Sequence, residues 1–388
     1  MPAPDPASAE HMEKVRAHIA ALIEERGGSI SFAEYMQEAL YAPGLGYYVA
    51  GSRKFGAEGD FVTAPETAPI FSRVLAHQVA EVLQQLPVGS RAIVEAGGGS
   101  GALASELLKK LAELDALPEQ YLFLEVSPEL AARQAEAIEN AMPEFVERVS
   151  WLADFPERFD GVFIANEVLD ALPAERFEKA AGEILQERVA ASEEGFVRAT
   201  APATDNLRNA VLSIEQNLSS ELAEGYRSEV CLAAPGWISD LASSMRQGFA
   251  FLMDYGISER EYYAPDRDDG WLRCYFRHRQ HNDPLRYPGI QDLTAWVNFS
   301  AVAEAASSAG LAIAGYLPQA RWLLEGGLQE ELLNMVEMPT DAQIELSRQV
   351  KVLTMPGEMG ENIKCLGLSA GEIDGPAVFQ RADKAHTL

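Results

Sequence analysis

Cysteine is scarce in this chain of 388 residues, which contains three cysteines and six histidines. Cys231, Cys274 and Cys365 stand far apart, and no C-x-x-C pair occurs. Isolated cysteines of this kind exclude a recognisable zinc site, and we expect no bound metal. They also favour a reducing compartment.

Basic residues and long hydrophobic runs are also in short supply. The chain has 31 Lys and Arg against 59 Asp and Glu, a formal net charge of −28. So acidic a surface repels nucleic acid and anionic lipid, so that neither a nucleic-acid partner nor membrane insertion is expected. No apolar run approaches transmembrane length, and the Pro- and Ala-rich start lacks the features of a targeting segment. We therefore expect a cytoplasmic protein, and the oligomeric state is left open.

What the chain does have is a glycine-rich turn in the stretch RAIVEAGGGSGAL at 91–103. An apolar run, typical of a buried parallel strand, leads into four glycines, and helical spacing follows. Glycines suit a turn with unusual dihedral angles and a ligand that lies against bare backbone. A strand, turn and helix in this order present backbone N–H groups to a ligand.

Two nucleotide chemistries fit this turn. Gly97-x-Gly99-x-x-Ala102 satisfies the dinucleotide pattern. Glu95-x-Gly97-x-Gly99-x-Gly101 satisfies the pattern of S-adenosylmethionine sites, in which the acid can receive the ammonium of the methionine moiety. The same acid would repel a doubly charged pyrophosphate in a dry cleft. The turn therefore favours S-adenosylmethionine over a nicotinamide dinucleotide.

Strands and helices alternate around this turn. Strands are predicted at 91–96, 121–126, near 148–152 and at 160–165, with helices at 102–114 and 128–140. This alternation predicts an α/β fold with a parallel sheet, helices on both faces, and a ligand at the carboxyl ends of the strands. Later strands at 248–254, near 311–317 and near 362–368, with a helix at 299–309, complete the sheet.

Other segments lie outside this alternation. Helices are predicted at 12–26 and from Ser31, which has capping-box spacing to Glu34, through Leu40. Insertions at about 175–247 and 257–297 interrupt the sheet, the first with a hairpin and one or two helices.

The block 46–66 combines glycine with aromatics. It is predicted to close over the ligand, with Asp60 and Thr63 as polar contacts. We divide the chain into an N-terminal cap and lid, 1–86, and a larger unit, 87–388, which carries the sheet.

Acidic residues stand at or just past the predicted strand ends: Glu95, Glu125, Glu167 and Asp254. Parallel strands gather such positions on one rim of a sheet, beside the glycine turn. Glu125 is placed to accept both ribose hydroxyls, and Asp154 to reach an adenine amino group. Their neighbours Val126 and Asn166 complete the predicted contacts with the ligand.

Glu167 and Asp170 are three residues apart, so a helical turn would direct both carboxylates the same way. Paired carboxylates can hold a guanidinium in bidentate fashion and keep it oriented for attack. We take these two acids as candidate catalytic residues.

Seven stretches, spread from about residue 12 to about residue 370, carry a family resemblance: ISFAEYMQEALYAPGLGYY at 30–48, FGAEGDFVTAPE at 55–66, IVEAGGGSGAL at 93–103, ANEVLDALP at 165–173, FLMDYG at 251–256, PGIQDLTAWVNF at 288–299 and MPGEMGENIKCLGL at 355–368. They resemble the MidA family of S-adenosylmethionine-dependent methyltransferases, whose mitochondrial members act as arginine methyltransferases in the assembly of respiratory complex I. NE-x-x-DALP and the GYY…GDF…TAPE block are specific to that family, and the glycine turn is not.

The resemblance implies a Rossmann-like class I methyltransferase sheet of seven strands, the last one antiparallel, with an N-terminal helical cap and two insertions. It implies S-adenosylmethionine as cofactor, bound at Glu95, Gly97, Gly99, Gly101 and Glu125. Family members usually carry Gly-Thr-Leu-Arg where this chain has Gly270-Trp271-Leu272-Arg273, and His and Asp where it has Trp296 and Asn298. These departures concern the substrate more than methyl transfer itself.

For the family's activity the acceptor is a protein arginine side chain, which implies a protein partner, with a respiratory-complex subunit as one candidate. Glu167 and Asp170 would then orient the guanidinium, with Asp254 as a third acid. Two alternatives stay open: a small-molecule methyltransferase, and a cofactor-binding assembly factor without catalysis. A nicotinamide-dependent oxidoreductase rests only on the spacing from Gly97 to Ala102.

Overall fold

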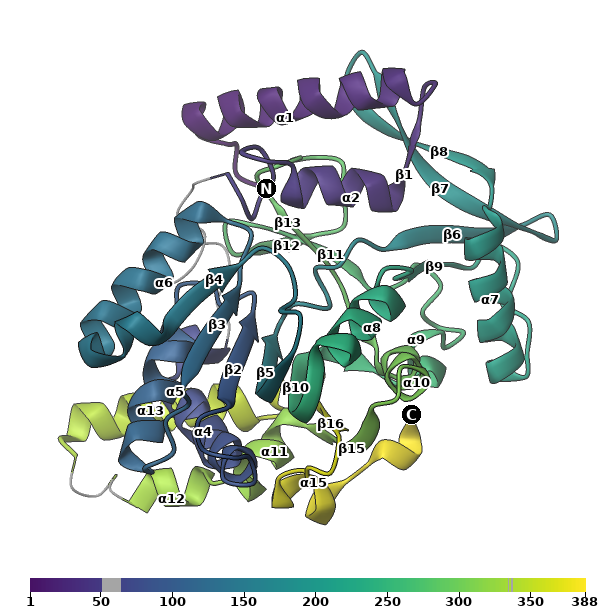
Figure 1. Ribbon diagram of the computed structural model, residues 1–388. Helices are drawn as coiled ribbons and strands as arrows, with labels where there is room; N and C mark the ends of the chain where they lie inside the picture. Colours follow the sequence, from purple (N-terminus) through teal and green to yellow (C-terminus); the bar gives the residue numbers. More distant parts are fainter. Residues whose placement is uncertain (51–63, 334, 336–337) are drawn as a thin grey trace.

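The computed structural model describes residues 1–50, 64–333, 335 and 338–388. Its centre is a sheet in which seven strands follow one another in the order β4–β3–β2–β5–β10–β16–β15 (Figure 1). The strands from β4 to β10 are parallel, and β16 runs antiparallel to both of its neighbours. Their bounds are β2 (Arg91–Ala96), β3 (Gln120–Leu124), β4 (Val149–Leu152), β5 (Phe159–Asn166), β10 (Met245–Ile257), β15 (Ala312–Pro318) and β16 (Ile363–Ala370).

Hydrophobic clusters cover both faces of the sheet. Successive side chains along a strand point to opposite sides, so neighbouring residues contribute to different clusters. Ile93 packs into a hydrophobic cluster on one face, and its neighbour Val94 packs into a second cluster on the other. The first cluster includes α4 (Pro69–Leu83), α5 (Ala102–Glu113), α6 (Pro128–Ala141), α11 (Gln319–Glu325) and α13 (Thr340–Thr354). The second includes α8 (Ala234–Ser244) and α10 (Phe299–Ser308).

Short elements connect these layers. They are α3 (Ala64–Thr67), the 3₁₀ turn η1 (Pro143–Arg148), α12 (Leu328–Leu332), α14 (Met359–Asn362), α15 (Ala377–Ala382) and the 3₁₀ turn η3 (Ala385–Thr387).

The predicted α/β class, with a mostly parallel sheet, is confirmed. The two-residue strand β14 (Val297–Asn298) pairs with the end of β10, so the described residues place eight strands in this sheet.

The N-terminal segment forms α1 (Pro6–Glu25), β1 (Ile30–Ser31) and α2 (Phe32–Tyr41). The predicted capping box is present: the Ser31 hydroxyl accepts the backbone N–H of Glu34 at 3.1 Å, and the Glu34 carboxylate accepts that of Ser31 at 2.9 Å. This reciprocal pair satisfies two N–H groups that would otherwise lack a partner at the start of the helix.

The first insertion is richer in strands than the hairpin we expected. It contains β6 (Glu175–Ala180), β7 (Glu183–Ser192), β8 (Gly195–Pro202), α7 (Asp205–Leu218), β9 (Arg227–Val230) and α8. Its strands and β1 of the N-terminal segment form a second sheet in the order β1–β7–β6–β9, with β8 on β7. Two of its pairings, of β1 with β7 and of β6 with β9, join segments distant in the chain, which a local pattern does not reveal.

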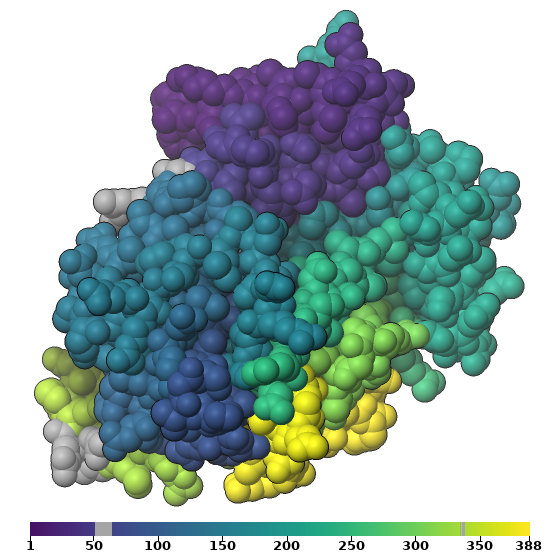
Figure 2. All heavy atoms as spheres, viewed as in Figure 1, coloured from purple at the N-terminus to yellow at the C-terminus, as the bar shows by residue number. Residues whose placement is uncertain are grey.

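The second insertion contains α9 (Glu259–Tyr262), β11 (Leu272–Phe276), β12 (Arg279–His281) and β13 (Asp292–Ala295), and its strands form a small sheet in the order β12–β11–β13. A shared hydrophobic cluster joins it to the N-terminal helices and to β7, with Ile19, Val189 and Leu293 among its members. The Tyr35 hydroxyl also donates to the carbonyl of Pro284 at 2.8 Å. The N-terminal segment (purple) therefore sits against both insertions (Figure 1). Figure 2 shows it packed beside the first insertion (teal).

The N-terminal segment and the two insertions together cover the carboxyl ends of the parallel strands, where the ligand is expected. The division of the chain at residue 86 stays a prediction. Among the described residues, no helix is both long and apolar enough to cross a membrane.

Candidate active site

A cavity of about 570 Å³ lies at the carboxyl ends of β2, β3, β4 and β5. Its floor is the glycine turn and the strand ends, and α2, α8 and the segment around Tyr48 contribute the remaining walls. It gathers most of the predicted cofactor-binding residues: Glu95, Gly97, Gly99, Glu125, Val126, Asp154 and Asn166. Asp60 and Thr63 lie outside the described residues.

The glycine turn has the left-handed backbone that favours glycine. The φ angles of Gly97 and Gly99 are +63° and +52°, and both residues line the cavity without a side chain. Gly101, at +85°, is not among the lining residues. It precedes α5, and a Cβ there would lie 3.1 Å from the Cα of Gln134. Gly101 thus lets α5 pack closely on α6.

Glu95 is 3% exposed, and its Oε2 accepts the hydroxyl of Tyr121 at 2.6 Å. Burial raises its pKa to about 7; the bond from Tyr121 lowers it and the charge of Glu125 adds to the rise. A cationic ligand group beside Glu95 would favour the charged form. The carboxyl group is therefore suited to an ammonium.

The Glu125 carboxylate is held by two donors: the backbone N–H of Ser127 at 2.8 Å and Nε2 of Gln134 at 2.9 Å. Gln134 is fully buried; its Nε2 also donates to the carbonyl of Gly99 at 3.0 Å, and its Oε1 accepts Nε1 of Trp151 at 2.9 Å. One side chain thus joins the turn after β2 to the acid after β3. Sequence reasoning missed Gln134, because its partners become neighbours only in the folded chain.

Two further predicted residues lie beside Glu125 at the cavity. Val126 is 59% exposed, which leaves an apolar surface available to a flat ring. Asp154 is exposed at the end of β4. Glu125 is placed for a ribose, and Val126 and Asp154 are placed for the ring and the amino group of an adenine.

The end of β5 brings Asn166 and Glu167 to the cavity. Glu167 has φ +54°, a left-handed value that is unusual for a residue with a side chain, and its N–H donates to the carbonyl of Met253 at 2.8 Å. Burial raises its pKa to about 8, and the charge of Asp254 adds to this, while the Asn166 amide lowers it. Oδ1 of Asn166 is buried without a partner among the described residues. Backbone strain and an unsatisfied acceptor are typical of functional sites.

A second cavity, of about 330 Å³, shares Glu167 with the first. We call it the acceptor cavity; its lining residues are Glu167, Asp170, Tyr255, Trp271, Arg273, Tyr275, Gln280, Thr294, Trp296 and Asn362. Asp170 is 3% exposed, and its Oδ1 has no partner among the described residues. Burial and the charge of Asp254 raise the pKa of Asp170 well above its usual range. This cavity therefore offers a buried acceptor to a donor-rich group.

Asp254, the third predicted acid, turns toward the backbone instead of either cavity. Its Oδ2 accepts the N–H groups of Val168 at 3.1 Å, Leu169 at 2.9 Å and Asp170 at 3.1 Å, and its Oδ1 accepts that of Tyr255 at 2.8 Å. Burial raises its pKa to about 7 against the lowering effect of these bonds. Asp254 holds the turn that carries the other two acids.

Several lining residues of the first cavity were not among the predicted site residues. Tyr41 is the last residue of α2, and Tyr48 lies in the aromatic stretch that follows it. The Tyr41 hydroxyl donates to the carbonyl of Ala171 at 3.0 Å, and that of Tyr48 to Oδ1 of Asp292 at 2.7 Å. The density of aromatics there was the available signal. Trp237 and Asp240 come from α8, inside the first insertion, where the sequence offers no signal.

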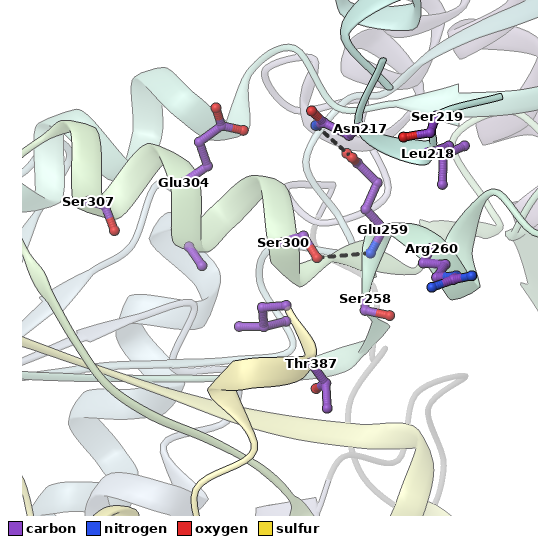
Figure 3. Close-up of a pocket in the computed structure, with 12 residues that line it drawn as sticks. Asn217, Leu218, Ser219, Ser258, Glu259, Arg260, Ser300, Glu304, Ser307 and Thr387 are labelled. Atoms are coloured by element: carbon purple, nitrogen blue, oxygen red, sulfur yellow. Dashed lines mark hydrogen bonds between the residues drawn. The ribbon is translucent and has the colours of Figure 1, made fainter. Parts of the chain in front are cut away.

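A larger hollow, of about 740 Å³, lies elsewhere, between the end of α7, α9, α10 and the last residues of the chain (Figure 3). Two bonds join polar groups of its lining: the N–H of Glu259 donates to the Ser300 hydroxyl at 2.9 Å, and Asn217 donates to the Glu259 carboxylate at 2.8 Å. It contains none of the predicted site residues. No cluster of potential metal ligands occurs within the described ranges.

The parallel sheet, the glycine turn and the rim acids together define a Rossmann-like methyltransferase that uses S-adenosylmethionine. The chain belongs to the family described as "Putative S-adenosyl-L-methionine-dependent methyltransferase", whose model matches residues 74–317. The resemblance to the MidA family is thereby confirmed. The residues of the first cavity fit the cofactor: Glu95 would receive its ammonium, and Glu125 its ribose.

Solved structures and relatives agree with this assignment. A protein from Burkholderia thailandensis, crystallised with S-adenosyl-homocysteine, is 38% identical and has a TM-score of 0.91, with 100% of both chains covered. A protein of Drosophila melanogaster named protein arginine methyltransferase NDUFAF7 homolog, mitochondrial, is 30% identical over 89% of this chain and 82% of its own. The Danio rerio protein of the same kind is 28% identical over 91% and 86%.

Proposed function

We propose that this methyltransferase transfers its methyl group to arginine side chains of a protein. The observation that carries the proposal is the acceptor cavity, which meets the cofactor cavity at Glu167 and contains the unpartnered Oδ1 of Asp170. The names of the relatives from fly and zebrafish support it. The acceptor protein itself stays a prediction.

A guanidinium suits these two acids. It has five N–H donors in a planar fork, which two carboxyl groups can accept together. Its charge is delocalised and its pKa exceeds about 12, so it is a poor nucleophile unless one nitrogen is aligned and charge is localised on the others. Glu167 and Asp170 would do both.

The proton balance assigns Glu167 a second task. When bound, the cofactor would supply an electrophilic methyl group, and its sulfur would keep the electron pair of the S–C bond that breaks. A guanidinium that gains a methyl group must lose one N–H proton, because its net charge stays +1. With a pKa raised to about 8, Glu167 releases its proton when a guanidinium binds and accepts the N–H proton as the new C–N bond forms. Glu167 therefore acts as the general base.

Asp254 would act through the turn and not on the acceptor. Its bonds to three consecutive N–H groups fix the direction of both catalytic acids. We assign it as a positioning residue.

Aromatic rings form another wall of the acceptor cavity. Trp271 and Trp296 stack with centroids 4.3 Å apart and ring planes 16° apart, and Tyr255 lies 6.3 Å from Trp296. Aromatic faces attract cations, more so where water is excluded. Both tryptophans stand at positions where the resembled family carries other residues, so this wall is a property of this chain.

The test is methyl transfer by Glu167→Gln. The amide keeps the shape and removes the charge and the base, so cofactor affinity should stay nearly unchanged. Transfer of labelled methyl groups to arginine-containing protein should fall by about 10²–10³, the usual loss when one preorganised charge-stabilising group is removed. Asp170→Asn should behave similarly, and the double variant should be little worse than either, because the two acids act on one group.

Glu139→Gln is the matched control, since Glu139 is an exposed acid on α6 away from both cavities. If Glu167→Gln labels protein as fast as the wild type, these acids do not orient the acceptor. If the wild type binds the cofactor but labels no protein, the small-molecule or non-catalytic alternative replaces the proposal.

A further inference from the structure

Arg273 lies between two cavities. It lines the acceptor cavity, which contains Glu167 and Asp170, and also an adjoining cavity of about 380 Å³. We call the latter the arginine cavity, because five arginines line it together with four aspartates: Arg176, Arg198, Arg227, Arg267 and Arg273, with Asp266, Asp268, Asp269 and Asp283. Arg273 is the residue that the two share.

The other cations of the arginine cavity have partners. Arg176 pairs with Glu187 at 3.2 Å and with Glu229 at 3.1 Å, and these contacts are buried. Arg198 pairs with Glu187, and Arg227 with Asp269 at 3.0 Å.

Arg267 instead lies over the ring of Trp271, 4.4 Å from its centroid. These four guanidinium groups are already used within the fold.

Arg273 differs from them. It is half-buried, and its Nη1 donates to the carbonyl of Leu272, the residue before it, at 2.7 Å. In the ranges that the structure describes, no carboxylate forms an ion pair with Arg273. Glu167 and Asp170 are among the carboxylates that do not. A half-buried cation in a cavity wall that forms no ion pair is free to receive an anion.

The strands fix how far this cation is from the catalytic acids. Arg273 on β11 is the register partner of Thr294 on β13, and the next residue, Ala295, donates its N–H to the carbonyl of Asp170 at 2.9 Å. Each of these two steps spans about 5 Å between Cα atoms. Consecutive Cα atoms of a peptide lie about 3.8 Å apart, so the neighbours of an arginine at Asp170 come within reach of Arg273.

We propose that Arg273 binds an anionic side chain of the acceptor, so that the preferred acceptor is an arginine with an aspartate or glutamate one or two residues away. The proposal rests on the proposed arginine methylation. It gives the acceptor cavity two ends, an acidic end for the guanidinium and a basic end for the neighbouring carboxylate. Arg273 is then a specificity-determining residue.

The test measures binding and transfer separately. Four acceptors are compared at saturating S-adenosylhomocysteine for affinity and with labelled S-adenosylmethionine for transfer. They are a peptide with one arginine flanked by Asp and Glu, its Asn and Gln counterpart, a counterpart flanked by lysines, and free arginine. The proteins are the wild type, Arg273→Gln and Arg279→Gln, the last being an exposed arginine on the same small sheet.

We expect the wild type and Arg279→Gln to bind the acidic peptide about tenfold more tightly than the amide peptide, as one charge-assisted hydrogen bond allows. Arg273→Gln should lose this preference, mainly through KM. Equal affinities in the wild type, or a preference that survives in Arg273→Gln, overturn the proposal. So does preferred binding of free arginine, whose own carboxylate would then be the anion. Absence of labelling with every acceptor contradicts arginine methylation itself.

Discussion

The carboxylate of Glu125 has its orientation fixed by the protein without a bound ligand. Ser127 and Gln134 each donate to one of its oxygens, so the carboxylate has a fixed orientation at the cavity. Each oxygen keeps lone pairs for a ribose hydroxyl. A fixed acceptor loses little conformational freedom on binding, which favours affinity.

Glu125→Ala should therefore weaken cofactor binding without unfolding the chain. The loss of two charge-assisted bonds costs on the order of 1.5–3 kcal/mol each. Titration calorimetry with S-adenosylmethionine measures the change, and Glu139→Ala on the exposed face of α6 is the control. Unchanged affinity in a folded Glu125→Ala protein would show that Glu125 is an acid of the loop that does not contribute to cofactor binding.

The raised pKa of Glu167 also predicts how stability depends on pH. The folded value of about 8 lies above the ordinary 4.5, so the folded chain binds this proton more tightly than the unfolded chain. The resulting stability is fully present below pH 4.5 and is lost as the pH rises through 8. Asp170 and Asp254, whose pKa values are also raised, act in the same direction.

Urea unfolding of the cofactor-free protein between pH 5 and 8.5 tests this relation. The stability of the wild type relative to Glu167→Gln should fall as the pH rises, because the amide does not titrate. Glu139→Gln, which changes an exposed acid, should follow the wild type across the range. Parallel curves for the wild type and Glu167→Gln would contradict the burial of a protonated Glu167.

At the level of elements, the contact between α5 and α6 positions the cofactor site. Gly101 permits this contact by its left-handed backbone and its missing Cβ, and Gln134 on α6 then reaches both Gly99 and Glu125. The packing of two helices is thus coupled to the geometry of the glycine turn. Gly101 affects the site without lining it.

Gly101→Ala should destabilise the protein by about 1–3 kcal/mol, because it adds both backbone strain and a contact of 3.1 Å. It should also weaken cofactor binding through the displacement of Gln134. The matched change is Gly236→Ala in α8, where a Cβ meets nothing within 4 Å, and we expect it to stabilise by roughly 0.5–1 kcal/mol. Similar stability changes in the two variants would contradict this account.

Elements also set the limit of what the sequence could predict. The strand, the glycine turn and Glu95 are consecutive, so a local pattern was enough to find them. The strand predicted to end at Asp254 continues to Ile257, and the direction of Asp254 toward the backbone depends on the turn at 168–170, which is distant in the chain. Gln134 has no motif around it, and its significance comes only from pairings between elements. Arg273 lies in the run Gly270–Arg273 that was compared with the family, but its place between two cavities depends on the pairing of β11 with β13.

At the scale of the molecule, the two long insertions and the N-terminal segment pack together and cover the carboxyl ends of the central sheet. One hydrophobic cluster joins all three, so they are expected to move and unfold together. The cavity proposed for the cofactor lies at the strand ends of the sheet, and the acceptor cavity is lined largely by the second insertion. Variation in the insertions can therefore change the acceptor while methyl transfer is retained.

Cofactor binding should stabilise the whole molecule. At about one hundred times its dissociation constant, S-adenosylmethionine should add roughly 2.7 kcal/mol to the free energy of unfolding, and NAD should add nothing. A thermal shift assay with both compounds makes the comparison. Stabilisation by NAD alone would contradict the role of Glu95 as an ammonium acceptor.

The central claim is that the methyl group reaches an arginine nitrogen of a protein. The measurement is transfer from S-adenosylmethionine with a deuterated methyl group into a cell extract, followed by complete hydrolysis and mass spectrometry of the amino acids. The account predicts deuterated methylarginine with the wild type and its near absence with Glu167→Gln. Label on another amino acid, or only on a small molecule, would contradict it.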